Sequence, residues 1–176
     1  GREMKDHNWR RGGYGMLKLP QTLWVSSNIG VSRIIDDHYK DNPEKYVQGI
    51  RRLGLADDLQ LPIPGYSPAK IRMPRKDSRG KQYVNWSKTT LPWMSIGYET
   101  QMPPISTLTF YNAIANGGKM MRPRFVKEVR KNGQVVMSFP PQVMREQIAK
   151  PVTISKITRI LELFFHVLFQ FLSNIC

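Results

Sequence analysis

The stretch WVSSNIGVSRI, residues 24–34, is the most informative part of this chain. A polar triplet, Ser26-Ser27-Asn28, stands directly before apolar residues at helical spacing. Serine and asparagine side chains accept hydrogen bonds from the free N–H groups of a first helical turn. The pattern therefore predicts a short helix whose first turn contains the triplet, with Ser26 or Ser27 as its cap. On spacing alone, a helix cap is the simpler interpretation of these residues.

Proline and glycine mark two further helices. One should begin at Asp41-Asn42-Pro43 and stop at Gly54, because proline is tolerated in the first helical turn and glycine is favoured just past the end. Another should begin at Pro103-Pro104 and end at Gly117-Gly118. Its apolar positions on one face are Ile105, Leu108, Tyr111 and Ile114.

The C-terminal half also carries a hairpin signal. Phe125 to Val129 and Val135 to Phe139 flank Lys131-Asn132-Gly133, and an Asn-Gly pair between β-branched runs predicts two antiparallel strands. A helical pattern resumes from Thr153 onward. With helices and strands segregated along the chain, the expected fold class is α+β. Residues 57–94 lack regular patterning, and we interpret them as a loop flanking a cleft.

Four segments together resemble the D,D-transpeptidase domain of class B penicillin-binding proteins, of the cell-division type. They are residues 24–34, SIGYE at 95–99, STLTFYNAIANGG at 106–118 and MMRPRFV at 120–126. The resemblance covers residues 1–156 and implies an internal fragment: a partial penicillin-binding or serine β-lactamase-like domain with helices, a long irregular loop and a β-hairpin. Residues 157–176 form an apolar tail that departs from the family.

The resemblance implies acyl transfer through a serine ester. The family combines three motifs, S-x-x-K, S-x-N and K-S/T-G, and its serine nucleophile is activated by the lysine one helical turn later. Ser26 would then be catalytic, hydrogen-bonding that lysine and helping to carry the proton to the leaving amine. Asn28 would be catalytic and substrate-binding, because its amide can donate to and accept from a peptide bond. Ser27 would be structural.

Only the second motif is expected to be functional in this chain. Ser67-Pro68-Ala69-Lys70 and Ser78-Arg79-Gly80-Lys81 match S-x-x-K by letter, but proline and glycine oppose the helix that the motif needs. Lys88-Thr89-Thr90 lacks the glycine of K-S/T-G. The chain alone should therefore be inactive.

The resemblance also implies partners and a location. The partners are peptidoglycan stem peptides ending in D-Ala-D-Ala, β-lactams, and cell-division proteins through the parent protein. The parent would act at the extracytoplasmic face of the bacterial cytoplasmic membrane, with its anchor absent from this chain. We expect no cofactor and no metal, because His7, His38 and His166 are widely separated and Cys176 is the only cysteine.

Charge supports an alternative from another class. The 176 residues carry a formal net charge of +14, which favours polyanionic partners. Residues 70–81 hold the densest basic stretch, with Tyr83 and Trp86 close behind, so a basic binding module for nucleic acid or an anionic polymer is the alternative function. No nucleic-acid motif accompanies this stretch, and we favour a solvated loop without nucleic-acid binding.

The apolar tail has three possible explanations. It could be a buried helix with Glu162, His166 and Gln170 as a polar stripe, a membrane-associating segment, or out-of-frame translation. A spanning helix needs roughly 20 mainly apolar residues, and polar residues interrupt this run. We rank a frameshift or truncation first.

Overall fold

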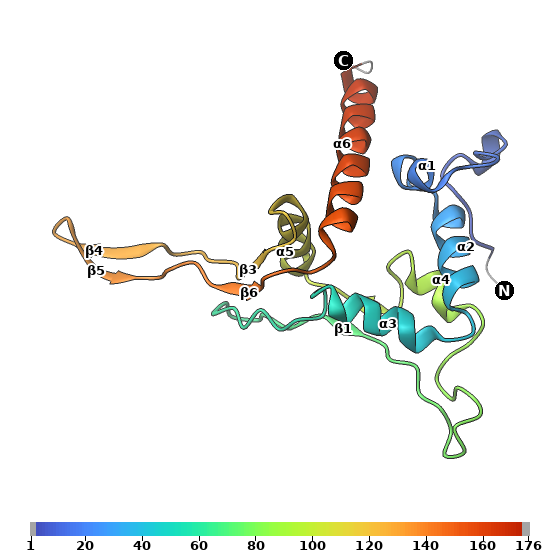
Figure 1. The fold of residues 1–176 in the computed structure, drawn as a ribbon, viewed down its shortest axis with the longest axis horizontal. Coiled ribbons are helices and arrows are strands. Elements are labelled where there is room, and N and C mark those ends of the chain that lie inside the picture. The colour runs from blue at the N-terminus through green and yellow to red at the C-terminus, as the bar shows by residue number, and fades with distance from the viewer. Residues whose placement is uncertain (1–2, 174–176) are drawn as a thin grey trace. The chain divides into compact units, whose positions relative to one another are not determined.

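The computed structural model describes the backbone of residues 3–173 and the side chains of residues 3–165. Helices and strands are both present, which confirms the α+β class (Figure 1). The chain divides into two compact units. The first comprises residues 1–49, 71–100 and 156–176, and the second comprises residues 50–70 and 101–155.

The first unit is built around α2. The short η1 (Trp9–Arg11) and α1 (Leu19–Trp24) precede α2 (Asn28–Tyr39), which packs against α1 and against α4 (Thr90–Met94). Ser27 is the N-cap of α2, so the helix predicted around the triplet is confirmed. Buried apolar side chains, among them Val47, Leu91 and Met94, form the core of this unit.

The two helices predicted from proline and glycine are confirmed. α3 (Pro43–Arg52) begins with its proline, and Gly54 follows it with φ of +83°. α5 (Pro104–Ala115) likewise ends before Gly117 and Gly118, both with positive φ.

The predicted apolar face of α5 is only partly buried. Ile114 is buried, but the Leu108 side chain is 53% exposed and that of Tyr111 is 48% exposed. The other buried positions of this helix are Ser106, Thr109 and Ala113. The helix is apolar around most of its circumference, so spacing alone could not select the buried side.

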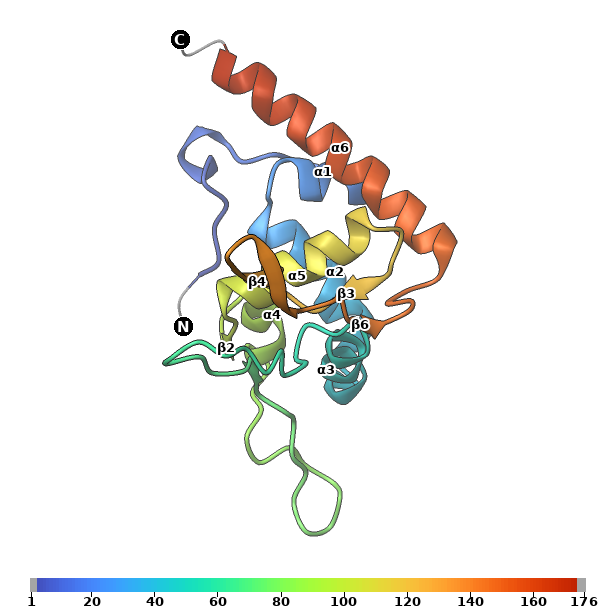
Figure 2. The ribbon, with the colours of Figure 1, turned by 90° about the vertical axis from the view of Figure 1, so that its left-hand side faces the viewer.

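An antiparallel ribbon dominates the second unit. β3 (Met120–Met121) pairs with β6 (Val143–Arg145), and β4 (Glu128–Lys131) pairs with β5 (Gln134–Ser138). Figure 1 shows that these ladders are successive parts of one long hairpin, and Figure 2 views it from the turn.

The predicted turn is confirmed. Asn132 and Gly133 have φ of +51° and +81°, and the residues on either side of them, Lys131 and Gln134, are paired across the hairpin. The first strand begins at Glu128 rather than at Phe125, because Pro140 and Pro141 on the opposite side lack the N–H groups that a continuous ladder requires.

Residues 57–94 contain more structure than the sequence predicted. β1 (Lys70–Ile71) pairs with β2 (Thr100–Gln101), and Lys76 forms an isolated bridge with Tyr83. α4 was missed because it has only five residues and contains Pro92, which reads as a helix breaker.

The helical pattern predicted from Thr153 is confirmed by α6 (Pro151–Ser173). Within the first unit, the Trp24 indole N–H donates to the Ile160 carbonyl at 3.2 Å and thereby connects α1 to α6. None of the helices in the described part of the chain is both long and apolar enough to cross a bilayer. The predicted polar stripe includes the side chains of His166 and Gln170, which lie outside the described residues. Cys176 also lies outside them.

Candidate functional site

The start of α2 is held by a buried carboxylate from a distant part of the sequence. The Ser27 hydroxyl donates to Asp6 Oδ2 at 2.7 Å and accepts from the Gly30 N–H at 2.9 Å. The Ile29 N–H donates to Asp6 Oδ1 at 3.1 Å. Asp6 and Ser27 are both buried, and an anion at this position also favours the positive end of the helix dipole. These bonds fix the orientation of the triplet.

The two outer members of the triplet flank this anchored position. Ser26 is exposed and has φ of +50°, a left-handed conformation that few non-glycine residues adopt. Asn28 is half-buried and its side-chain N–H donates to the Lys5 carbonyl at 3.3 Å. Ser27 is turned inward as a cap, so its position agrees with the structural role inferred from the sequence.

Asn28 lies in the wall of an open cavity of about 560 Å3. α4 and the turn after it form the facing wall with Trp93, Ile96 and Tyr98. The rings of Trp93 and Tyr98 meet edge to face, with centroids 5.1 Å apart. The N-terminal segment Glu3–Lys5 completes the lining. The cavity therefore combines one amide with aromatic and charged side chains.

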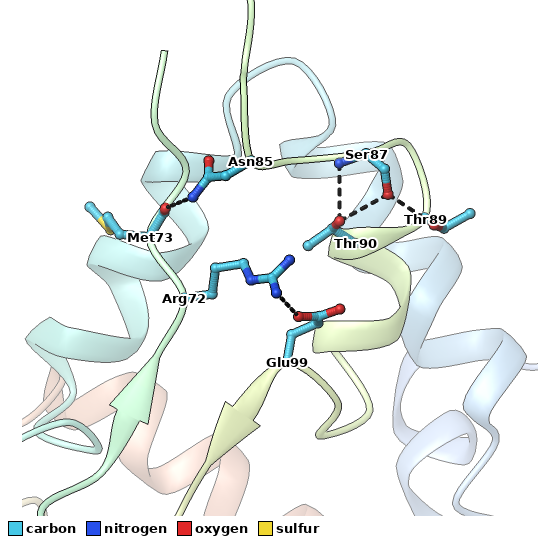
Figure 3. Close-up of polar contacts among 7 residues, drawn as sticks. All are labelled: Arg72, Met73, Asn85, Ser87, Thr89, Thr90 and Glu99. Carbon is cyan, nitrogen blue, oxygen red and sulfur yellow. Dashed lines mark hydrogen bonds and ion pairs between the residues drawn. The ribbon is translucent and has the colours of Figure 1, made fainter. Parts of the chain in front are cut away.

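Polar contacts fix the elements that carry the aromatic wall. At the start of α4, the Ser87 N–H donates to Thr90 Oγ1 at 3.0 Å. After the helix, Glu99 has φ of +62° and forms an ion pair of 2.9 Å with Arg72. Figure 3 shows the Arg72 guanidinium directed at the Glu99 carboxylate. Because Glu99 directly follows Tyr98, this pair restrains the turn that lines the cavity.

The cavity has the groups to bind a peptide but not a nucleophile with its base. The Asn28 amide offers both a donor and an acceptor. Lys5, the lysine in the lining, pairs with Glu3 at 3.4 Å and lies 3.8 Å from the centroid of the Trp9 ring. The amide in the cavity wall can therefore pair with a peptide group, and Ser26 is not among the residues that line the cavity.

The other motif-like matches lie outside this cavity. Ser67 to Lys70 and Ser78 to Lys81 are not helical, so their serine and lysine are not one helical turn apart. Lys88 and Thr89 precede α4, where Thr90 is buried in the first turn. These positions agree with the interpretation of all three as chance matches.

The basic stretch of residues 70–81 runs through exposed loop for most of its length. The Tyr83 hydroxyl behind it donates to Glu44 Oε2 at 2.5 Å, and Lys76 Nζ lies 5.3 Å from the centroid of the Tyr83 ring. Burial, followed by the hydrogen bond that Tyr83 donates to Glu44 and by the charge of Glu44, raises the pKa of Tyr83 to about 12. Its ring is already engaged within the chain, which disfavours it as a stacking platform for bases.

In the part of the chain that the structure describes, no three His, Cys, Asp or Glu side chains come together to hold a metal. His7 contacts the Tyr14 hydroxyl, and the His38 ring contacts the Ile34 carbonyl within α2.

Sequence reasoning missed four residues of the site: Asp6, Trp93, Ile96 and Tyr98. Asp6 meets a hydroxyl that lies 21 positions later, and no local pattern reports such a contact. Trp93 belongs to α4, within the residues interpreted as loop, while Ile96 and Tyr98 lie in the turn after that helix. The family-like segment SIGYE contains two of them and was the available signal.

Comparison with known proteins places the whole site inside one family. Residues 1–165 match the family model described as penicillin binding protein transpeptidase domain. A search of curated protein sequences found no match.

Solved structures share the fold. The D,D-transpeptidase domain of a peptidoglycan glycosyltransferase from Eggerthella lenta matches with a TM-score of 0.63 and 24% identity, over 87% of this chain and 37% of that one. Penicillin binding protein 3 from Mycobacterium tuberculosis, complexed with aztreonam, matches with a TM-score of 0.61 and 22% identity, over 85% and 31%.

A peptidoglycan glycosyltransferase from Burkholderia ambifaria matches with a TM-score of 0.59 and 24% identity, over 85% of this chain and 41% of that one. The chain thus spans well under half the length of each of these three structures.

Proposed function

Because this chain belongs to the family of penicillin-binding protein transpeptidase domains, we propose that it forms the S-x-N side of the substrate cleft of a peptidoglycan D,D-transpeptidase. The observation that carries the proposal is Asn28, whose amide lies in the wall of the cavity on a helix start anchored by Asp6. The chain provides recognition and proton transfer, while the nucleophilic serine, its lysine and the K-S/T-G strand are supplied by other segments.

Each residue of the triplet then has a distinct role in the reaction. The serine of S-x-x-K attacks the D-Ala-D-Ala carbonyl carbon, forms an ester and releases D-alanine, and an amine of a neighbouring strand then displaces the serine. The Asn28 amide holds the substrate's peptide bond, and the Ser26 hydroxyl passes the proton from the lysine to the leaving amine. Ser27 keeps both neighbours in place through Asp6.

Further parts of the proposal concern the parent protein. It binds β-lactams because they mimic the D-Ala-D-Ala bond and acylate the same serine. It acts with cell-division proteins at the extracytoplasmic face of the cytoplasmic membrane. These assignments rest on the resemblance of residues 24–34 and 95–126 to the cell-division type.

Fluorescent penicillin tests the division of roles. The purified 176-residue chain should show no covalent label, since it has no activated serine. In a longer polypeptide that also carries S-x-x-K and K-S/T-G, labelling should occur, and Ser26→Ala or Asn28→Ala should slow acylation by about 10²-fold or more. Ser95→Ala, whose hydroxyl donates to the Pro92 carbonyl, is the matched control. Stoichiometric labelling of the short chain would overturn the proposal.

A further inference from the structure

The antiparallel ribbon of the second unit opens between its two ladders. On one side of the gap the Arg122 N–H donates to the Gln142 carbonyl at 2.9 Å, and on the other the Phe139 N–H donates to the Lys127 carbonyl at 2.9 Å. Proline has no N–H and cannot continue a ladder. The prolines between these bonds are Pro123, Pro140 and Pro141.

A groove of about 630 Å3 occupies this opening. Its walls include Phe125, Val126 and Phe139, and the first two side chains are 60% and 49% exposed. Arg122 and Arg124 also line it. The groove therefore combines apolar walls with two permanent positive charges.

Neither arginine is neutralised by a carboxylate of the described residues. Arg122 donates to the neutral amides of Gln142 and Gln60, at 2.9 and 2.7 Å, and Arg124 donates to the Phe139 carbonyl.

The carboxylates of this unit are engaged elsewhere. Asp57 pairs with Arg145, Glu128 with Arg130 and Glu146 with Lys119, while Asp58 accepts from the Tyr66 hydroxyl. An acidic group for the two groove arginines must therefore come from outside this unit.

β5 runs up to the groove, and among the described residues it pairs with β4 alone, so its other edge is free. Its sequence, Gln134–Ser138, contains no charged residue and no proline, which are the usual protections of an edge strand. The register skips Val136, so the ladder is irregular there. Beyond this irregularity Met137 and Ser138 are again in register with β4, and Ser138 lines the groove.

We propose that this groove and the adjacent edge of β5 bind an extended polypeptide segment in which acidic side chains alternate with apolar ones. Its backbone adds to the edge near Met137, an apolar side chain enters between Phe125 and Phe139, and a carboxylate meets Arg122 or Arg124. Strand addition provides affinity and the pocket provides selectivity. The site uses residues of the second unit alone and does not depend on Ser26 or Asn28.

A second copy of this chain is the poorer occupant. Pairing β5 with β5 would bring two strongly basic molecules together, and three of the four acidic groups in this unit are already in ion pairs while Asp58 accepts from the Tyr66 hydroxyl. Charge complementarity therefore selects an acidic partner rather than self-association.

Fluorescence anisotropy with the full chain tests the proposal. The probe is a short labelled peptide of alternating glutamate and valine, compared with the same peptide carrying glutamine for glutamate. The glutamate peptide should bind saturably and the glutamine peptide should bind more weakly. The double variant Arg122→Gln/Arg124→Gln should weaken binding of the glutamate peptide about tenfold. Arg79→Gln/Lys81→Gln, which removes the same charge from an exposed loop, should leave binding unchanged.

A further variant guards against a folding defect in the arginine variants. Val126→Glu keeps both arginines but places a carboxylate in the groove, and it should also weaken binding of the glutamate peptide. Three results would refute the proposal: equal affinity for the two peptides, equal loss in the control variant, or dimerisation through β5 detected by sedimentation. The first excludes charge recognition, the second indicates unspecific attraction to a basic chain, and the third assigns the edge to a second copy.

Discussion

Adjacent serines of the triplet have opposite environments. Ser27 is buried and bonded to Asp6 Oδ2 and to the Gly30 N–H, whereas Ser26 is exposed and left-handed. One serine can therefore be structural while the other remains available for chemistry.

This difference predicts unequal effects of two alanine substitutions. Ser27→Ala removes the helix cap and leaves a buried Asp6 oxygen without its donor, so we expect the free energy of unfolding to fall by about 1–3 kcal/mol. Ser26→Ala should change it by less than about 0.5 kcal/mol. Urea denaturation followed by tryptophan fluorescence measures both. Equal losses would contradict the assigned roles.

Tyr83 predicts a dependence of stability on alkaline pH. Burial and Glu44 raise its pKa from 10.0 to about 12, so the folded state retains the phenolic proton more strongly than the unfolded state. The resulting stabilisation is complete below pH 10 and is lost as the pH rises towards 12. Tyr83→Phe should flatten the fall in the free energy of unfolding over this range. The exposed Tyr111→Phe is the control, and an unchanged slope in Tyr83→Phe would contradict the assignment.

At the residue scale, the sequence revealed local chemistry but not distant contacts. The cap at Ser27 was predictable because its partner, the Gly30 N–H, is three residues away. Asp6 was not, because its contact with Ser27 forms only when two segments fold together. The same reason hid the pair between Arg72 and Glu99.

At the scale of elements, proline and glycine determined what could be predicted. α3 and α5 both begin at a proline and end near a positive-φ glycine, and both were predicted. α4 was missed because one short turn carries too little periodicity to stand out, and Pro92 suggests a loop. Which side of α5 is exposed depends on the elements that pack against the helix. The spacing of apolar residues along the sequence does not identify those elements.

The hairpin turn gives a prediction for one element. Gly133 has φ of +81°, a conformation that costs a residue with a Cβ about 1 kcal/mol. Gly133→Ala should therefore reduce the hydrogen-exchange protection of β4 and β5 about fivefold. Gly133→Asn is the matched control and should cost less, because asparagine tolerates this region. A larger loss for asparagine than for alanine would contradict the turn geometry.

At the scale of the whole molecule, the chain belongs to the transpeptidase family and shares its fold with longer proteins. The family match covers residues 1–165, while the chain spans 41% or less of the structures described above. Of the three family motifs, the chain carries S-x-N in its expected context. In the proposed function, S-x-N acts together with the other two motifs in a larger unit.

The most direct test of this account is the DNA sequence on both sides of the reading frame, translated in every frame. We predict S-x-x-K upstream of Gly1 and K-S/T-G downstream of Ile157, in the same or a shifted frame, which would also identify the frame of the apolar tail. If neither motif lies within one domain's length, the S-x-N triplet has no transpeptidase site to complete, and the proposed function is wrong.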